Sequence, residues 1–251
     1  MKISFKAGVF AVIAGVLLVP ATSSAYSREE TSTGQGLYQS ALPLNYYINV
    51  KCSDKEGGSG DDQAECVKAV KDSFITWTGP SCTGYTVAKP TMTERTDTGY
   101  DPEGKDNINL VVWRFEGWSQ PPLDYPKSAL AITTNVFYDK TGEVVKSDIE
   151  VNGEDYEWKV VEGPDKDHMD IQNTMTHEAG HVLGLGHSDD PNAVMYYSVK
   201  PGETSKRVLA QDDIDGVCAI YPKGVHPDAG APDSGPQPDK PGGCSCSNAG
   251  L

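Results

Sequence analysis

Histidine, basic residues and long apolar runs are all scarce in this sequence. The chain has 251 residues with five histidines, and 21 lysines and arginines stand against 36 aspartates and glutamates, for a formal net charge of −15. Such an acidic chain repels phosphate backbones and anionic lipid surfaces, which argues against nucleic acid or a membrane surface as a partner. No CxxC…CxxC pattern occurs either, so the cysteines do not indicate a zinc site.

The first 25 residues have the pattern of a signal peptide. Lys2 and Lys6 form a basic start, the apolar run AGVFAVIAGVLLV follows, and small residues precede a predicted cut after Ala25. The alternative is a membrane anchor, but the run is too short to cross a bilayer comfortably. Cleavage would remove two lysines and no acidic residue, which changes the net charge from −15 to −17. We therefore expect a secreted protein.

Six cysteines fit the oxidising environment of an exported protein. Four of them, Cys52, Cys66, Cys82 and Cys218, lie in the part of the sequence that has the composition of a folded domain. Two disulfides are favoured over free buried thiols, but four cysteines can pair in three ways and the sequence does not choose among them.

The last 29 residues, 223–251, change in composition. They are rich in Pro, Gly, Asp and Ser and have almost no apolar side chains, so they predict an extended tail without a packed core. Near the end, GGCSC with Cys244 and Cys246 resembles the start of the C-terminal sorting signals of myxobacterial surface proteins, which would imply a place at the cell surface. A local disulfide and two free thiols remain alternatives.

Between these ends the sequence predicts one α/β domain at residues 38–222, preceded by a short segment, 26–37, and expected to be monomeric. Apolar periodicity predicts helices that begin near Asp61, Asp170 and Gln211. β-branched and aromatic runs predict strands at 44–50, 83–88, 107–115, 130–138 and 144–151, with a hairpin turn at 139–142. This order predicts a mostly consecutive sheet with helices packed on it.

Three of the five histidines lie within THEAGHVLGLGHS, residues 176–188. His177 and His181 are four residues apart, so a helix places both on one face, where two imidazoles can bind one Zn²⁺. Gly184 allows the helix to end with a positive φ angle, so that the chain turns back and presents His187 as a third ligand. Three protein ligands leave one position for water, as in a catalytic zinc site, and Glu178 is placed to act on that water without being a ligand.

The full pattern HExxHxxGxxH arises by chance on the order of once in 10⁵ chains of this length. It is the motif of the metzincin metallopeptidases. Ser188 after the third histidine and Met195 in DDPNAVMYY resemble the matrixin branch, in which that methionine forms the Met-turn beneath the zinc. The segments LAQDDIDGVCAIYP and LPLNYYINV resemble the last helix and first strand of this family, so the resemblance covers roughly residues 40–222.

The resemblance implies a metzincin-type fold and an endopeptidase with one catalytic Zn²⁺, a protein or peptide substrate, and Glu178 as the general base. It places an extended substrate along the edge strand at 129–135, with Leu130 and Ala131 in contact, and assigns Val182 and the loop after Met195 to the pocket beyond the cut. It also implies that either Asp212 or Asp213, which we expect to cap the last helix, braces the Met-turn.

Several family features are missing or altered. Only His168 precedes the motif, so we expect no second, structural zinc, and the segment before the domain has no cysteine to act as a latency switch. A Ca²⁺ site formed by Asp139, Glu143 and Asp148 is possible in chemical terms, although a solvated acidic loop is the favoured interpretation. His168 and His226 are expected to face solvent.

Tyr197 is a further departure, because matrixins usually have proline two residues after the methionine. Related metzincins, the astacins and serralysins, have a tyrosine there that stabilises the oxyanion. A phenol near the metal has the same capacity here. The alternative is that the ring packs against the wall of the cleft.

Two other functions compete with a general endopeptidase. One is an exported zinc-binding module for adhesion or inhibition, which has no need of the base Glu178. The other is a processing enzyme with a single dedicated substrate, which the sequence does not distinguish from a broad protease.

Overall fold

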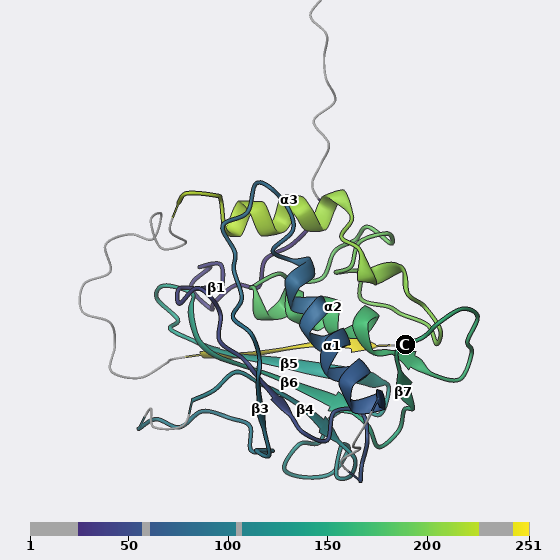
Figure 1. Cartoon of the computed structure of the whole chain (residues 1–251). Coiled ribbons are helices and arrows are strands. Elements are labelled where there is room, and N and C mark those ends of the chain that lie inside the picture. Colours follow the sequence, from purple (N-terminus) through teal and green to yellow (C-terminus); the bar gives the residue numbers. More distant parts are fainter. Residues whose placement is uncertain (1–24, 57–60, 104–106, 226–242, 251) are drawn as a thin grey trace, which may run out of the picture.

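A mixed β-sheet with helices on one face makes up the part of the chain that the computed structural model describes, residues 25–56, 61–103, 107–225 and 243–250 (Figure 1). The strand order is β3-β2-β4-β6-β5-β9, and β1 also pairs with β6. The strands of this sheet are β1 (Tyr38–Gln39), β2 (Tyr47–Asn49), β3 (Thr91–Thr93), β4 (Leu110–Arg114), β5 (Ala129–Phe137), β6 (Glu143–Asn152) and β9 (Gly243–Gly250). Two short strands, β7 (Trp158–Lys159) and β8 (Met169–Asp170), pair separately. The predicted α/β class is confirmed.

The sheet is parallel except for β5, which runs antiparallel to its neighbours β6 and β9. β5 and β6 form the predicted hairpin, closed by hydrogen bonds between Tyr138 and both Glu143 and Gly142. Gly142 has φ +76°, and a Cβ there would meet the carbonyl group of Gly36, so this turn requires glycine. The predicted strands 130–138 and 144–151 are confirmed to within a residue or two.

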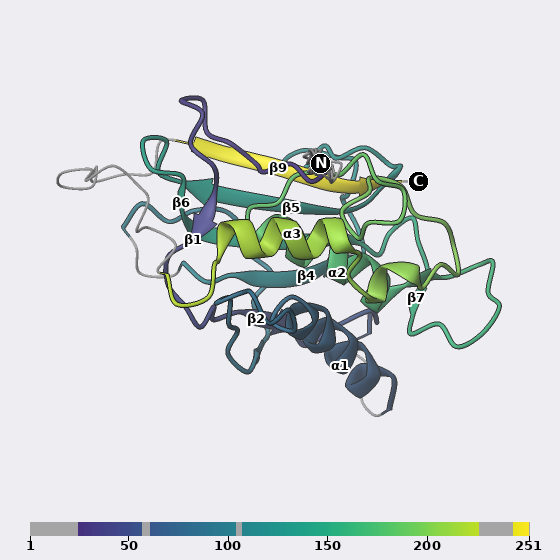
Figure 2. The same cartoon turned by 90° about the horizontal axis from the view of Figure 1, so that it is seen from above.

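The three helices begin close to the predicted positions: α1 at Asp61–Thr76, α2 at Ile171–Val182 and α3 at Gln211–Ile220. Asp170 caps α2 by accepting a hydrogen bond from the amide of Asn173, and it also pairs with Arg207. Figure 1 and Figure 2 show α1 and α2 side by side on one face of the sheet, with α3 on the side of α2 away from the sheet. Both the apolar residues and the histidines of α2 are therefore buried. Helical periodicity alone predicted burial of the apolar face and not of the face that carries the histidines.

Two disulfides join the four cysteines of the predicted domain, as expected, and the structure gives their pairing. Cys52 bonds to Cys66, and Cys82 bonds to Cys218. The second bridge closes a segment of 136 residues and ties the chain after α1 to α3. In the loop-entropy account, a cross-link over such a long segment stabilises the fold by about 4–5 kcal/mol.

Two sequence predictions about strands were wrong. Residues 83–88 form isolated bridges through Thr83 and Val87 but no strand, and the neighbour of β2 is β3 instead. The predicted unstructured tail contains β9, which pairs with β5 along Gly243–Gly250. The tail prediction rested on side-chain composition, whereas strand addition requires only backbone groups. Among the described residues, no helix is long and apolar enough to span a membrane.

Candidate metal centre

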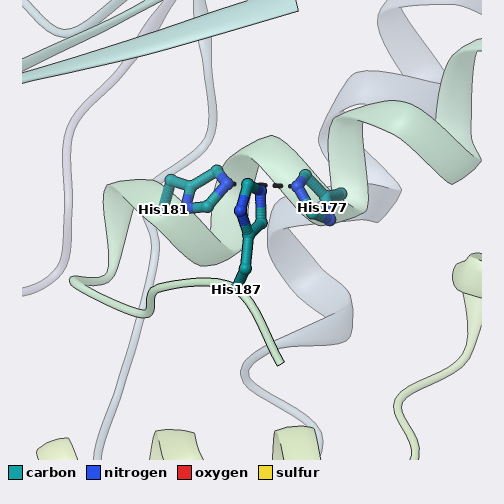
Figure 3. A group of neighbouring side chains, drawn as sticks. All are labelled: His177, His181 and His187. Atoms are coloured by element: carbon teal, nitrogen blue, oxygen red, sulfur yellow. Dashed lines mark hydrogen bonds between the residues drawn. The ribbon is translucent and has the colours of Figure 1, made fainter. Parts of the chain in front are cut away.

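The three motif histidines converge on one point (Figure 3). One ligand nitrogen from each of His177, His181 and His187 lies within 4.8 Å of the others. The first two project from adjacent turns of α2, and the third comes from the loop that follows. Gly184 has φ +100° after the end of the helix, and a Cβ at this position would collide with the carbonyl group of Leu37. The predicted turn back of the chain is confirmed.

Hydrogen bonds at the far side of two rings define which nitrogens face the centre. The Nδ1 atom of His177 lies 2.7 Å from the Val194 carbonyl oxygen, and that of His181 lies 2.8 Å from the Leu185 carbonyl oxygen. Because a carbonyl only accepts, each Nδ1 donates and each Nε2 has a lone pair directed inward.

The two Nε2 atoms lie 3.1 Å apart. Two nitrogen lone pairs at this distance repel each other. If no cation lies between them, the Nε2 atom of one ring must carry an additional proton. A zinc ion with tetrahedral geometry and Zn–N bonds of about 2.0–2.1 Å holds two nitrogens roughly 3.3 Å apart, so the spacing suits it. Three nitrogen donors and the inward lone pairs therefore fit a zinc ion.

The protein lowers the pKa of one ligand and raises that of another. Burial, followed by the nearby charges of His181 and Lys206, holds the pKa of His177 well below its usual value. Burial also acts to lower the pKa of His181, but the hydrogen bond to Glu29 and the charge of Glu178 outweigh it and raise the pKa. The Glu29 carboxylate lies 3.3 Å from the His181 Nδ1 atom, where it helps to fix the orientation of the ring.

Glu178 lies beside the triad and is completely buried. Its Oε2 atom accepts a hydrogen bond of 2.5 Å from the hydroxyl of Thr133 on β5. A buried carboxylate next to three imidazoles is a candidate general base.

Met195 follows the third histidine by eight residues and is 1% exposed. Asp213 of α3 accepts hydrogen bonds from the amides of Val194 and Met195, and also caps α3 through the amide of Ala210. The Met195 sulfur packs directly over Gly180, where a Cβ would overlap with it. The structure thus assigns the expected bracing of the turn to Asp213.

Comparison with known proteins agrees with this geometry. The Matrixin family profile matches residues 61–222. The chain belongs to the matrixin family. It is 31% identical to human neutrophil collagenase over 179 residues, which cover 71% of this chain and 33% of that protein. It is 47% identical to metalloendoproteinase 1 of Glycine max over 68 residues, 27% of this chain and 21% of that protein. The alignments with these relatives thus span a third or less of their length.

In this matrixin, Asp212 has a role that the sequence did not indicate. Its Oδ1 atom accepts hydrogen bonds from the backbone nitrogens of Ala25 and Tyr26, both at 2.8 Å, and its Oδ2 atom accepts one from Ser188. Asp212 therefore attaches the N-terminal segment to the loop that presents the third histidine.

The residues assigned to substrate contact occupy different environments. Leu130 and Ala131 are buried on β5, and the backbone of Ala131 lies opposite Ala249 of β9. Val182 is a core residue that packs between the helices and the sheet with Phe74 and Ile149, and its assignment to the substrate pocket stays a prediction. Its position on α2 faces the sheet, which the spacing of the motif alone did not reveal.

Tyr197 is 55% exposed, with its ring centroid 6.4 Å from that of His187. Its hydroxyl accepts a hydrogen bond of 3.4 Å from Tyr196. In the described conformation the ring is thus near the triad but is not packed into a wall.

The candidate calcium ligands do not come together. Asp139 accepts hydrogen bonds from Ser32, Glu143 accepts one from Ser40, and Asp148 pairs with Lys146 at 3.0 Å. His168 is partly exposed beside Asp165, and His226 lies outside the described residues.

Proposed function

We propose that this chain is an exported zinc-dependent endopeptidase. The observation that carries the proposal is the convergence of His177, His181 and His187 beside the buried carboxylate of Glu178. Family membership supports the same chemistry, since the similar proteins include a collagenase and a metalloendoproteinase. Two disulfides and the predicted signal peptide support export.

Each group at the centre has a distinct role in the proposed reaction. When bound, zinc would polarise the scissile carbonyl and increase the acidity of water. Glu178 takes a proton from the attacking water and passes it to the leaving amine. Glu29 and the backbone carbonyls of Val194 and Leu185 hold the ligand rings in place.

We propose that a substrate lies extended along β5, as the matrixin resemblance implies. This strand adjoins α2, which carries two of the ligands, so a peptide on its edge would pass close to Glu178. Backbone pairing gives affinity with little dependence on side chains. Leu130 and Ala131 would contribute through their backbone groups.

An exported zinc-binding module without turnover is the competing function. Such a module requires the triad but gains nothing from a carboxylate buried beside it, because burial of a charge costs free energy. The position of Glu178 therefore favours the enzyme.

A peptide-library digest with the purified chain tests the proposal. We expect one bound zinc per chain, internal cleavage that a chelator abolishes, and recovery when zinc is restored. Glu178→Gln should retain zinc but lose about 10²–10⁴-fold in activity, whereas His181→Ala should lose the metal. Zinc binding without any cleavage in the wild-type protein would support the binding module instead.

A further inference from the structure

The carboxylate of Glu178 is held by a residue 45 positions earlier in the chain. Thr133 lies in the middle of β5, between Ile149 of β6 and Ser247 of β9 in the sheet. Its hydroxyl donates to the Glu178 Oε2 atom at 2.5 Å, and both side chains are completely buried. The contact joins the strand to the helix that carries the histidines.

A buried hydrogen bond of this kind constrains the carboxylate strongly. Hydrogen bonds from a hydroxyl to an ionised carboxylate are short, about 2.5–2.7 Å, and roughly twice as strong as those between neutral groups. The donor is itself rigid, because a β-branched side chain in a strand has restricted χ1 angles. Thr133 can therefore fix the rotamer of Glu178.

We propose that Thr133 is a positioning residue for Glu178. The Thr133 hydroxyl holds the Oε2 atom of Glu178. The other carboxylate oxygen, Oε1, is then the one that we assign to proton transfer from the attacking water. This inference rests on the proposed function, but its structural part, the control of the Glu178 rotamer, does not require turnover. Thr133 acts through Glu178 and does not touch the reacting atoms.

Three variants separate positioning from simple packing. Thr133→Val keeps the shape and removes the hydroxyl, and Thr133→Ser keeps the hydroxyl and removes a methyl group. Thr174→Val is the matched control, because Thr174 is also buried and its hydroxyl has no hydrogen-bond partner in the structure.

We expect Thr133→Val to lower kcat by about 10–100-fold, with KM and zinc content unchanged. Thr133→Ser should recover kcat to within about threefold of wild type, and Thr174→Val should match wild type. Crystal structures of the zinc-free proteins should show Glu178 turned away from β5 in Thr133→Val only.

An unchanged kcat and an unchanged Glu178 rotamer in Thr133→Val would overturn the inference. So would a serine variant as impaired as the valine variant. If the wild-type chain cleaves no peptide, the proposed function fails, and the zinc-free rotamers still decide whether Thr133 positions Glu178.

A separate observation concerns the edge of β5. β9 pairs antiparallel to β5 from Ala129 to Phe137 (Figure 2), and it also contacts α2. The hydrogen-bonding edge that a substrate strand would use is thus taken by residues 243–250. A strand edge accepts one partner at a time, so a peptide can pair there only if β9 leaves.

We infer that residues 243–250 restrain the proposed peptidase by occupying its substrate edge. This sequence, GCSCSNAG, contains no large apolar residue, and it belongs to the same chain as the edge that it occupies. A tethered segment has an effective concentration in the millimolar range, which is sufficient to compete with weakly bound peptides. A substrate with favourable side-chain contacts would displace it.

Deletion of residues 243–251 tests this second inference. We expect KM for a cleaved peptide to fall at least about tenfold, with kcat little changed, and the amides of β5 to exchange faster with solvent. A full-length chain with Ser245→Pro and Ser247→Pro should behave like the deletion, since proline cannot donate to the ladder.

Unchanged exchange at β5 together with an unchanged KM would overturn the inference. If the deletion makes the β5 amides exchange faster but neither the full-length chain nor the deletion variant cleaves a peptide, the proposed function fails and the pairing of β9 with β5 stands.

Discussion

The Oδ2 atom of Asp213 lies 2.8 Å from the backbone nitrogen of Val194, whose carbonyl oxygen lies 2.7 Å from the Nδ1 atom of His177. One residue of the Met-turn thus connects the last helix to a metal ligand. The orientation of the His177 ring therefore depends on a carboxylate in α3, which contacts neither the ring nor the metal position.

Asp213→Ala should destabilise the fold and weaken the metal site together. The substitution leaves the amides of Val194, Met195 and Ala210 without their acceptor. A few unsatisfied buried groups cost about 2–4 kcal/mol in the free energy of unfolding. Denaturant titration and zinc titration measure the two effects. Asp215→Ala, at an exposed position of the same helix, is the control, and equal results for both variants would contradict this role.

Gly180→Ala should also destabilise the protein, against the usual trend for helices. Alanine in place of glycine normally favours a helix by about 1 kcal/mol. Here the added methyl group would overlap with the Met195 sulfur and with the Trp77 ring. We expect a loss of about 1–3 kcal/mol in thermal or denaturant unfolding, and a gain in stability would show that this packing is looser than described.

Much of the metal centre could be predicted because its information is local. The spacing of His177, His181 and His187, with Gly184 at the turn, fixes the helix, its end and the return of the chain. The partners of these residues could not be predicted in this way. Thr133 and Glu29 reach the site through pairings of distant segments, and isolated threonine or glutamate residues have no sequence signature of that role. Asp213 was expected through the family resemblance alone, which did not choose between it and Asp212.

The errors in the fold have a similar origin. Residues 83–88 have a composition suited to a strand, but only Thr83 and Val87 form bridges, one each. The segment that pairs with β2 is instead the more polar Thr91–Thr93. The composition of residues 243–250 predicts an extended tail, yet their backbone pairs with β5. Side-chain patterns indicate which residues are buried, and they do not determine which backbone edges meet.

Lys206 should make stability depend on pH in the weakly alkaline range. Its side chain is 3% exposed, and burial lowers its pKa to about 8, against the opposing charges of Glu203, Asp213 and Glu178. Between that pKa and the unfolded value near 10.4, the unfolded chain binds more protons, so the free energy of unfolding rises with pH. The slope is at most about 1.4 kcal/mol per pH unit.

Comparison with Lys206→Met isolates this contribution, because the other titrating groups are common to both proteins. The difference in unfolding free energy, wild type minus variant, should be constant below about pH 7 and should increase from pH 8 to 9.5. A difference that stays constant across the whole range would mean that Lys206 keeps an ordinary pKa in the folded protein.

Tyr197→Phe decides between the two roles considered for the tyrosine after the Met-turn. A phenol that donates to the oxyanion contributes mainly in the transition state, so its loss would lower kcat by about 10²–10³-fold with little change in KM. The structure does not support this role for the hydroxyl, and it does not pack the ring into a wall either. The Tyr197 ring is more than half exposed, and its hydroxyl is engaged with that of Tyr196. We therefore expect phenylalanine to change kcat by less than about threefold at unchanged zinc content.

Steady-state kinetics on a peptide from the library digest measure this, with Tyr196→Phe as the control for loss of the hydroxyl pair. A hundredfold fall in kcat for Tyr197→Phe alone would show that the side chain turns towards the metal when substrate binds.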